Sequence, residues 1–371
     1  MSEGLLKNKK ILCHIKDMTR GGAERVMSVL IDSMVNDGAQ VVLVTLDKGK
    51  DEYFVDERVE RIEIDKLTHF SNAASRFTKR MLTLRKIIKE QKPDFVLSFC
   101  SKENFRCSLA MKGINIPLIV SVRSNPAEHY SNGILKAVLA SRIDGCVFQS
   151  ENAKQYFSAK IQNKSCVIMN PIDREYFDAN ISYEKSDTDE IRIVTAGRIF
   201  KSKNHIHMVK SFIAIADECP KAQLYLYGKD DNDGSSEIVR NAIAESSCGD
   251  RIHIMGPCST WPQEITKADI FVMTSIFEGM PNALLEAMVV GLPVISTDCP
   301  CGGPAAVIED GVNGRLVPMY EIEPLSEAMK ELINDRQKRK MFGQNAMKVR
   351  EFVDTETVCN QWKEYMLSLS R

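Results

Sequence analysis

Short apolar runs rich in strand-forming residues alternate with helical stretches along the whole chain. A clear example starts at Asp269-Ile-Phe-Val-Met-Thr, a strand pattern, and continues into a helical pattern that stops at Gly291 and Pro293. This alternation predicts an α/β protein with parallel sheets, because parallel strands are joined by a helix that crosses back over the sheet. With 371 residues, the chain is long enough for two domains that each bury a core.

Two glutamates, Glu278 and Glu286, flank the predicted start of the helix that follows this strand. Pro281 suits the first turn, since the amide hydrogen that it lacks would have had no partner there. Backbone amides at a helix start lie beside a partial positive charge and can hold a phosphate. Here they belong to Met280, Asn282 and Ala283. A nucleotide sugar would fit, with its phosphates on the helix start and its hydroxyls on the two glutamates. A plain helix start with a surface glutamate at each end is the alternative interpretation.

Two further loops follow strand patterns and carry groups that suit a diphosphate. Gly21-Gly22 lies between the strand pattern 9–15 and the helical stretch 26–34, where glycines let a backbone approach a diphosphate closely. The dinucleotide spacing G-x-G-x-x-G is absent, and plain turn chemistry is the alternative. After the strand pattern 191–196, Arg198 offers a planar fork and Lys203 a point charge. Lys201 is a rival for the lysine role, and two surface cations in a loop are the alternative.

Taken together, these motifs resemble family 4 of the retaining glycosyltransferases. The segment from Glu278 to Glu286 resembles the paired-glutamate motif of that family, Gly21-Gly22 resembles its donor-facing glycine loop, and Gly197-Arg198 with Lys203-Asn204 resembles its phosphate clamp. The resemblance continues through four more segments, Lys267–Ser275, Gly291–Asp298, Gly302-Gly303-Pro304 and Ile308–Val317, and it extends from about residue 10 to about residue 320. Within the family, Arg123-Ser-Asn-Pro126 together with Glu278-Gly-Met-Pro-Asn looks most like bacterial enzymes of surface-polysaccharide and lipid-linked-oligosaccharide assembly.

The resemblance implies the GT-B architecture, in which two Rossmann-like domains with parallel sheets face each other across a cleft. We expect an N-terminal, acceptor-binding domain at residues 1–177 and a polar linker at 178–190. A C-terminal, nucleotide-sugar-binding domain should follow at 191–352. The final segment, 353–371, is expected to form a helix that crosses back to the first domain.

The resemblance also assigns roles to the site residues. Glu278 would hold the hydroxyls of the donor sugar, and Glu286 would hold the ribose hydroxyls. The catalytic set is then Glu278, Arg198 and Lys203, with Arg198 and Lys203 stabilising the departing diphosphate in place of a metal. The expected donor-binding residues are Gly21, Gly22, Gly279, Met280, Asn282, Ala283 and Glu286. Retention of the anomeric configuration is implied, by a front-face route in which the leaving phosphate accepts the acceptor's proton.

Two residues of the N-terminal half are candidates for contact with the acceptor or the sugar. Many family members place a histidine beside the sugar, and His129 is the nearest residue to that position. An ordinary loop histidine is the alternative. Arg123 is expected to contact the donor or a phosphate-bearing acceptor.

No metal and no other cofactor is expected. The two Asp-x-Asp segments, Asp187-Thr-Asp189 and Asp231-Asn-Asp233, fall in the predicted linker and in a polar loop, which indicates solvent-exposed turns. The eleven cysteines are scattered, and Cys299 and Cys301 have no second pair to complete a zinc site. With no signal-peptide pattern and no apolar run of membrane-spanning length, the chain is expected in the cytoplasm.

Charge is distributed unevenly, although the formal net charge is only −1. The N-terminal half has more Lys and Arg than Asp and Glu, and its densest cationic segment is Arg76–Lys92. Apolar residues at helical spacing separate these cations, as in a helix that lies on a membrane surface. A solvated face above an ordinary core stripe is the alternative. We expect peripheral contact with the inner face of the cytoplasmic membrane and no nucleic-acid partner.

The expected donor is a UDP-hexose or UDP-N-acetylhexosamine, with GDP-mannose second, and the choice depends on the pocket around Gly228, Ile254–Gly256 and Met280. The expected acceptor is a growing glycan on a polyprenyl diphosphate carrier. Two other classes compete with this hypothesis. One is a sugar-nucleotide epimerase or hydrolase of the same architecture, which would consume the donor without an acceptor. The other is a non-catalytic scaffold at the membrane, which would lack clamp residues that this chain retains.

Overall fold

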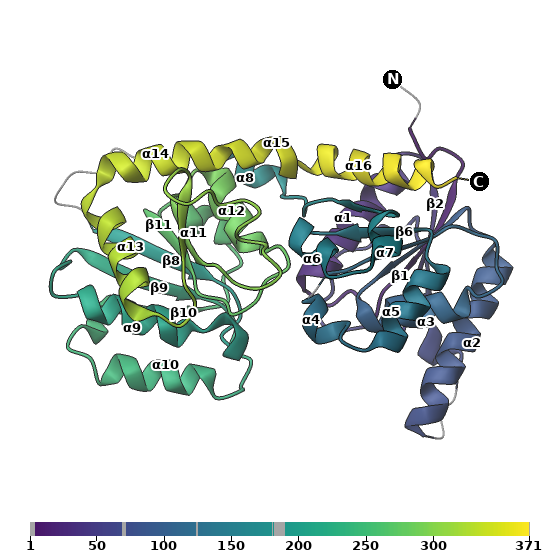
Figure 1. Cartoon of the computed structure of the whole chain (residues 1–371), viewed down its shortest axis with the longest axis horizontal. Coiled ribbons are helices and arrows are strands. Elements are labelled where there is room, and N and C mark those ends of the chain that lie inside the picture. The colour runs from purple at the N-terminus through teal and green to yellow at the C-terminus, as the bar shows by residue number, and fades with distance from the viewer. Residues whose placement is uncertain (1–3, 69–71, 124, 180, 182–189, 371) are drawn as a thin grey trace. The chain divides into compact units, whose positions relative to one another are not determined.

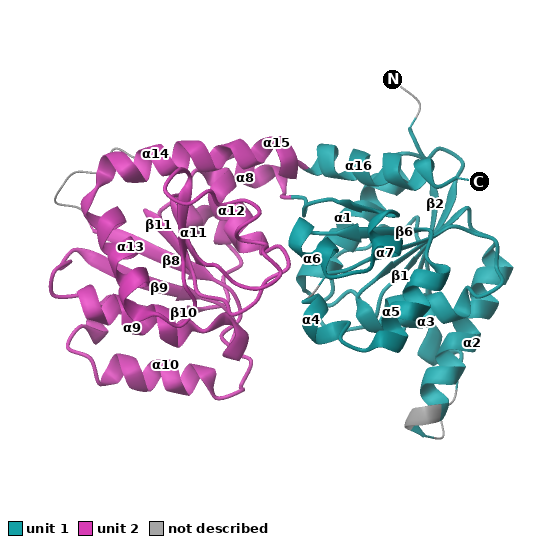
Figure 2. Ribbon diagram, in the orientation of Figure 1, with its two compact units in different colours: residues 1–171, 355–371 teal, residues 172–354 magenta. Residues whose placement is uncertain are grey.

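A computed structural model describes residues 4–68, 72–123, 125–179, 181 and 190–370, excluding the side chains of residues 73 and 74. The chain forms two compact units (Figure 2). Unit 1 comprises residues 1–171 and 355–371, and unit 2 comprises residues 172–354. Unit 2 therefore begins before the expected linker, most of which lies outside the described residues.

Unit 1 contains a parallel sheet of seven strands in the order β3-β2-β1-β4-β5-β6-β7 (Figure 1). The strands are β1 (Lys10–His14), β2 (Gln40–Thr45), β3 (Glu60–Glu63), β4 (Phe95–Phe99), β5 (Leu118–Ser121), β6 (Gly145–Phe148) and β7 (Ser165–Val167). The helices are α1 (Gly22–Asn36), α2 (Ala73–Gln91), α3 (Ser101–Ala110), α4 (Pro126–His129), α5 (Gly133–Arg142), α6 (Glu151–Gln155), α7 (Ala159–Gln162), α16 (Thr355–Ser368) and the 3-10 turn η1 (Ile64–Lys66).

Each face of this sheet carries a hydrophobic core, because successive side chains of a strand point to opposite faces. Ile11 and Cys13 of β1 pack with α1 and α16, whereas Leu12 packs with a cluster that includes Leu84 of α2. The last helix, α16, belongs to this unit: the fully buried Trp362 packs on Phe99 with the ring centroids 5.6 Å apart.

Unit 2 contains a parallel sheet of six strands in the order β10-β9-β8-β11-β12-β13. The strands are β8 (Ile191–Ala196), β9 (Ala222–Tyr227), β10 (Ile252–Gly256), β11 (Ile270–Met273), β12 (Val294–Thr297) and β13 (Gly314–Val317). The α-helices are α8 (Arg174–Asp178), α9 (His205–Ile215), α10 (Ser235–Ala244), α11 (Trp261–Ile265), α12 (Asn282–Val290), α13 (Ile322–Asn334), α14 (Arg336–Ala346) and α15 (Arg350–Val353). Three 3-10 turns complete the unit, η2 (Lys201–Lys203), η3 (Gly249–Arg251) and η4 (Met347–Val349). The predicted α/β class with two parallel sheets is confirmed.

Helix α2 carries both buried and exposed apolar side chains within the segment Arg76–Lys92. Its C-terminal half packs on the sheet through Leu84, Ile87 and Ile88, which are buried, so this part is an ordinary core stripe. Its N-terminal half projects from unit 1 (Figure 1), and Phe77 and Leu82 there are 36% and 54% exposed. None of the helices in the described ranges is long and apolar enough to cross a membrane.

Candidate active site

The predicted clamp residues of unit 2 gather at one point of its sheet. Strands β8 and β11 are neighbours, but the sheet continues from β8 to β9 on one side and from β11 to β12 on the other. The loops after β8 and β11 therefore diverge at the carboxyl edge, and open parallel sheets bind their ligands at such a switch point. Arg198 and Lys203 follow β8, and Glu278 follows β11.

Hydrogen bonds join these two loops. The amide of Ile276 donates to the carbonyl oxygen of Ser202 at 2.8 Å, and the Thr274 hydroxyl lies 3.1 Å from the Lys203 carbonyl oxygen. On the next strand, the Thr297 hydroxyl donates to the Ser275 carbonyl oxygen at 2.6 Å. The backbone around the clamp is therefore held by bonds that do not use the clamp side chains.

Lys203 and Glu278 form an ion pair. The Lys203 Nζ donates to Oε1 of Glu278, and the Ser275 hydroxyl donates to the same oxygen at 2.7 Å. The two charged side chains are 24% and 14% exposed, so the pair is reachable but well shielded. The side chain of Lys201, the rival lysine, is exposed, and its backbone amide donates to Asp233. Of the two lysines, the structure therefore places Lys203 beside Glu278.

Arg198 has a counter-ion that the sequence did not indicate. Its Nη1 donates to Oδ2 of Asp231 at 2.7 Å, and its guanidinium lies 4.7 Å from the centroid of the Phe200 ring. Asp231 belongs to the second Asp-x-Asp segment, and the other carboxylate of that segment, Asp233, accepts the Lys201 amide at 2.9 Å. Both carboxylates lie in an exposed loop, as predicted. The first such segment lies outside the described residues.

Glu286 is held by a tryptophan that the sequence interpretation missed. The indole Nε1 of Trp261 donates to Oε2 of Glu286 at 3.0 Å, and both side chains are buried. The Tyr227 ring packs on Trp261 with the centroids 5.2 Å apart. Trp261 is one of only two tryptophans in the chain, and this rarity could have marked it as a candidate site residue. No spacing rule, however, connects it to Glu286.

Two glycines at this edge of the sheet lie so close to a neighbouring backbone segment that a side chain would not fit. Gly228 has φ +158°, and a Cβ added there would overlap the carbonyl oxygen of Gly197. A Cβ added at Gly303 would overlap the carbonyl oxygen of Gly279. Alanine at either position therefore requires the loops that carry the clamp to move.

The helix start differs by one position from the prediction. Pro281 is the capping residue of α12 rather than a first-turn residue, since its ψ of 115° is still extended. Asn282 and Ala283 then open the helix, after the buried Met280. The predicted helix end is confirmed, since Gly291 closes α12 with φ 92°.

Burial sets the protonation of the histidine next to this site. The pKa of His205, at the start of α9, falls to about 4 because of its burial and then because of the Lys203 charge. His205 is therefore neutral at pH 7 and adds no charge beside Lys203. Within the described ranges, no group of three or more His, Cys, Asp or Glu residues could hold a metal ion.

Unit 1 carries the remaining predicted residues. Gly21 caps α1, Gly22 is its first residue, and Arg123 follows β5. The Arg123 Nη2 donates to Oδ1 of Asn170 at 2.5 Å. The His129 side chain is 41% exposed and lies 4.0 Å from Glu128, so its predicted role gains no geometric support within unit 1.

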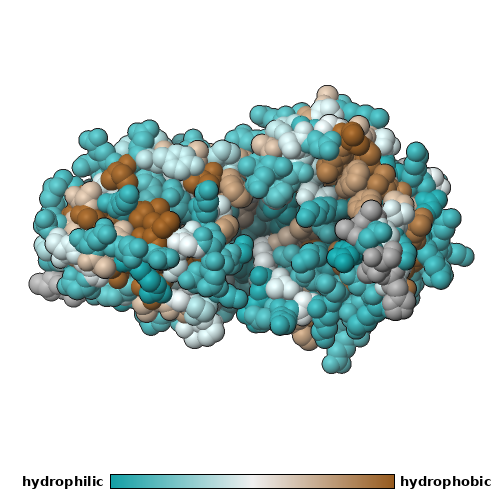
Figure 3. Space-filling model, turned by 90° about the horizontal axis from the view of Figure 1, so that it is seen from below, coloured by the Kyte–Doolittle hydropathy of each residue, from teal (hydrophilic) through white to brown (hydrophobic). Residues whose placement is uncertain are grey.

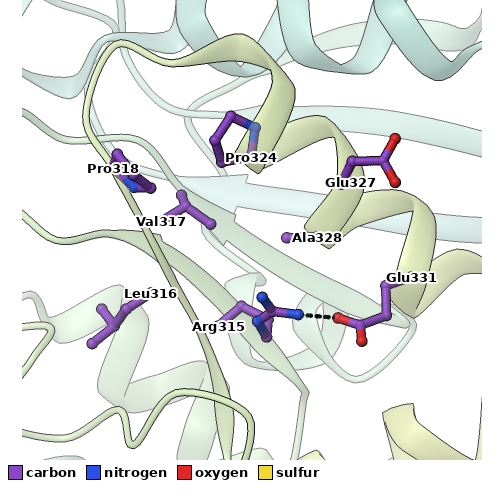
Figure 4. A pocket seen from close by; sticks show the side chains of 8 residues that line it. All are labelled: Arg315, Leu316, Val317, Pro318, Pro324, Glu327, Ala328 and Glu331. Atoms are coloured by element: carbon purple, nitrogen blue, oxygen red, sulfur yellow. Dashed lines mark hydrogen bonds and ion pairs between the residues drawn. The ribbon is translucent and has the colours of Figure 1, made fainter.

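A separate hollow of about 350 Å³ lies on the outer edge of unit 2, between β13 and α13 (Figure 4). Two of its charged lining residues, Arg315 and Glu331, bond to each other, and Lys338 from outside the lining also donates to Glu331. None of the predicted site residues lines it.

The two halves of the chain match two different protein families. Residues 20–176 match the family described as Glycosyltransferase Family 4, and residues 177–349 match the family described as Glycosyl transferases group 1.

One relative is a Campylobacter jejuni protein named GalNAc-alpha-(1->4)-GalNAc-alpha-(1->3)-diNAcBac-PP-undecaprenol alpha-1,4-N-acetyl-D-galactosaminyltransferase. It is 25% identical over 360 residues, which cover 95% of this chain and 97% of that protein. Another is the UDP-Gal:alpha-D-GlcNAc-diphosphoundecaprenol alpha-1,3-galactosyltransferase of Escherichia coli, which is 22% identical, with 85% of each chain covered.

Solved structures agree with this fold. Anabaena HepE, solved with UDP and glucose, superposes with a TM-score of 0.80 at 18% identity, covering 97% of this chain and 100% of that one. The lipopolysaccharide outer core galactosyltransferase WaaB, solved in its apo form, gives a TM-score of 0.77 at 19% identity, covering 97% of this chain and 99% of that one. At these identities the likeness shows the fold.

Proposed function

Since the chain belongs to the GT-B glycosyltransferases, with a family 4 N-terminal half and a group 1 C-terminal half, we propose that it transfers a hexose or N-acetylhexosamine from a nucleotide sugar to a hydroxyl of a lipid-linked glycan. The observation that carries the proposal is the clamp at the switch point of unit 2. There, two cations and two held carboxylates share one edge of the sheet.

The donor diphosphate would bind Arg198 and Lys203. Arg198 is 61% exposed, and its ion pair with Asp231 lies on the loop surface, so a phosphate can replace that carboxylate at little cost. Lys203 has three ammonium protons, so it can keep Glu278 and also donate to a phosphate oxygen. As the bond to the sugar breaks, both cations stabilise the charge that develops on the leaving diphosphate.

Glu278 and Glu286 would hold hydroxyls at the two ends of the donor. Glu278 keeps its second carboxylate oxygen for the sugar, because Lys203 and Ser275 both contact Oε1. Glu286, held by Trp261, would accept the ribose hydroxyls. Neither carboxylate is assigned as a nucleophile, since each is used for binding.

The proposed reaction retains the anomeric configuration and requires no metal. The bond between the anomeric carbon and the phosphate oxygen breaks, and the acceptor oxygen forms the new bond from the same face of the sugar. The proton of the acceptor hydroxyl passes to the leaving phosphate oxygen, so no protein base is needed. The cationic clamp supports the metal-free route, because it supplies positive charge where a metal ion would otherwise be required.

UDP is the preferred nucleotide and GDP the second choice. UDP occurs in the HepE complex and in the name of the E. coli relative. The names of both relatives given above include an undecaprenol carrier linked through a diphosphate, which supports a polyprenyl diphosphate-linked acceptor.

Helix α2 supports peripheral contact with the inner face of the cytoplasmic membrane. Its exposed face combines cations, including Lys79 and Lys86, with the exposed apolar side chain of Leu82, whereas Phe77 lies on the opposite face and stacks on Phe105. Figure 3 looks onto the end of unit 1 from which α2 projects and shows apolar side chains gathered there among polar ones. Such a surface binds anionic lipid through charge and shallow apolar insertion.

The test is turnover with a panel of UDP-sugars and GDP-mannose, measured as nucleotide release with and without a lipid-linked glycan acceptor. Release that requires the acceptor supports transfer, whereas equal release without it indicates a hydrolase or epimerase.

Glu278→Gln should lower kcat by about 100-fold or more, a loss typical of removing one charged group of a transition-state site. Glu237→Gln, an exposed glutamate on α10, is the matched control and should leave kcat unchanged. Normal turnover by a folded Glu278→Gln protein would contradict the assignment.

A further inference from the structure

The clamp of unit 2 pairs each of its two cations with a carboxylate of the protein. Lys203 pairs with Glu278, and Arg198 pairs with Asp231, whose Oδ2 accepts from Nη1 at 2.7 Å. Glu278 has a task in the proposed function, since it holds the donor sugar. Asp231 has no such task, and a negative charge beside a bound diphosphate opposes binding. The Asp231 carboxylate therefore weakens the affinity of the clamp for its donor.

Asp231 is fixed beside Arg198 by backbone contacts. The loop that carries Asp231 follows β9, and it is bonded to the loop that follows β8. The Ile199 amide donates to the Lys229 carbonyl oxygen at 2.8 Å, and the Asp231 amide donates to the Ile199 carbonyl oxygen at 3.3 Å. A parallel β-bridge also joins Ile199 to Asp230. These contacts do not use the Asp231 carboxylate, so the carboxylate remains close when a phosphate binds Arg198.

A cationic clamp by itself would favour the product of the reaction over the donor. The diphosphate of a nucleotide sugar is esterified at both ends and carries two negative charges. When the bond to the anomeric carbon breaks, the terminal phosphate of the product takes up the acceptor's proton and then releases it to solvent. The second pKa of such a phosphate is about 6, so above pH 7 the product carries a third negative charge. Tight binding of this product would slow the next turnover.

We infer that Asp231 sets the preference of the clamp between donor and product, because its fixed charge repels a released nucleoside diphosphate more strongly than a nucleotide sugar. The inference rests on the proposed function, which places the diphosphate on Arg198 and Lys203. Two unit charges about 5–6 Å apart in water change an equilibrium constant by about threefold to fourfold. Asp231 therefore lowers the affinity for the product by about threefold more than the affinity for the donor.

Asparagine at position 231 separates this role from simple positioning of Arg198. The Asp231 side chain is 27% exposed, so the substitution places no unpaired amide in a core. Asparagine keeps an oxygen that accepts from the Arg198 Nη1, but it has no charge. If Asp231 only orients the guanidinium, the substitution affects both ligands alike. If its charge selects between them, the two affinities change by different factors.

The test measures binding without turnover. UDP and UDP-glucose are titrated by calorimetry into wild type, Asp231→Asn and Asp231→Glu at about pH 8, where the terminal phosphate of UDP is ionised. We expect Asp231→Asn to tighten both ligands, and to tighten UDP by about threefold more than UDP-glucose, because UDP carries one more negative charge. Asp231→Glu keeps the charge and should keep the wild-type ratio of the two affinities.

Asp217→Asn is the matched control, because it removes an exposed carboxylate just beyond the far end of α9. It should change neither affinity. Salt gives a second readout, since ions screen a repulsion between charges but do not alter which atoms a side chain contacts. In 1 M NaCl, where the Debye length is about 3 Å, the extra gain for UDP in Asp231→Asn should largely disappear.

An unchanged ratio of the two affinities in folded Asp231→Asn would overturn the inference, because Asp231 would then only orient Arg198. A changed ratio that persists in 1 M NaCl would also overturn it, since the effect would not be electrostatic. Melting temperatures of the free proteins report on folding, and an exposed Asp231→Asn should leave the Tm unchanged. A fall in Tm with an unchanged ratio would make Asp231 a structural residue and overturn the inference as well.

These outcomes are distinct from failure of the proposed function. Arg198→Ala should lose most of the affinity for both ligands. If wild type binds neither UDP and UDP-glucose nor GDP and GDP-mannose, the proposed donor clamp fails, and the inference fails with it. If wild type binds one of these pairs and Arg198→Ala does not, the clamp stands, and an unchanged ratio in Asp231→Asn then refutes the inference alone.

Discussion

The hydrogen bond from Trp261 to Glu286 gives the sharpest prediction for donor binding. Replacing Trp261 by phenylalanine removes the Nε1 donor 3.0 Å from Oε2 of Glu286 but keeps a ring against Tyr227. A hydrogen bond to a charged group contributes about 1.5–3 kcal/mol, which corresponds to about a 10- to 150-fold change in an equilibrium constant. Part of this appears as lost stability, so we expect UDP affinity to fall by about 10-fold.

The effect should appear in binding rather than in the chemical step. Glu286 would contact the ribose, which does not change during the reaction, so its contact stabilises ground state and transition state alike. Trp261→Phe should therefore raise KM for the nucleotide sugar by about 10-fold and change kcat by less than about threefold. Calorimetry with UDP and initial rates at varied donor concentration measure the two quantities.

Trp362→Phe is the matched control. The Trp362 indole nitrogen is buried in unit 1 and has no hydrogen-bond partner among the described residues, so its removal breaks no such bond. A double-mutant cycle of Trp261→Phe with Glu286→Leu should show coupling, because phenylalanine lacks the donor and leucine lacks an acceptor, so both changes remove the same bond. Unchanged UDP affinity in folded Trp261→Phe, or full additivity of the two changes, would refute the reasoning.

Three further predictions concern stability, loop packing and membrane contact. Burial lowers the pKa of His14 to about 3. Between pH 6.5 and 3 the unfolded chain therefore binds a proton that the folded chain does not. The free energy of unfolding should fall as the pH falls through this range, by up to about 1.4 kcal/mol per pH unit from this residue. Urea unfolding of wild type and His14→Gln from pH 4.5 to 7 should show a shallower pH dependence in the variant, and equal slopes would contradict this. Gly228→Ala should lower both Tm and UDP affinity, because its Cβ meets the Gly197 carbonyl oxygen, whereas Gly113→Ala, a glycine with φ +74° and open space around it, controls for backbone strain alone. Replacing Lys79 and Lys86 by alanine should weaken sedimentation with anionic vesicles by about 30-fold, at about 1 kcal/mol per lysine, and unchanged sedimentation would argue against α2 as the contact.

Local signals in the sequence were enough for the α/β class and for some of the elements. The strand that starts near Asp269 and the helix end at Gly291 follow from short-range chemistry, namely strand-forming side chains and a glycine with positive φ. The position of Pro281 was wrong by one residue, since proline's fixed φ suits both the capping position and the first turn.

The contacts across the sheet could not be read from the sequence. Arg198 meets Asp231, and Trp261 meets Glu286, because the strand order brings separate loops to one edge. No periodicity encodes that order. Helix α2 shows a related limit: Phe77 and Leu84 belong to one apolar repeat, but only tertiary packing decides that Leu84 is buried and Phe77 is 36% exposed.

The central claim is that unit 2 binds a nucleoside diphosphate through a cationic clamp without a metal. A thermal-shift measurement with UDP, GDP, ADP and CDP, with and without EDTA, on wild type and Arg198→Ala, tests it most directly. A ligand at 100 times its Kd stabilises the folded state by about 2.7 kcal/mol, which is easily seen as a rise in Tm. We predict that UDP raises the Tm of wild type equally with and without EDTA, and that Arg198→Ala loses most of this rise. No shift with any nucleotide, or a shift that EDTA abolishes, would contradict the claim.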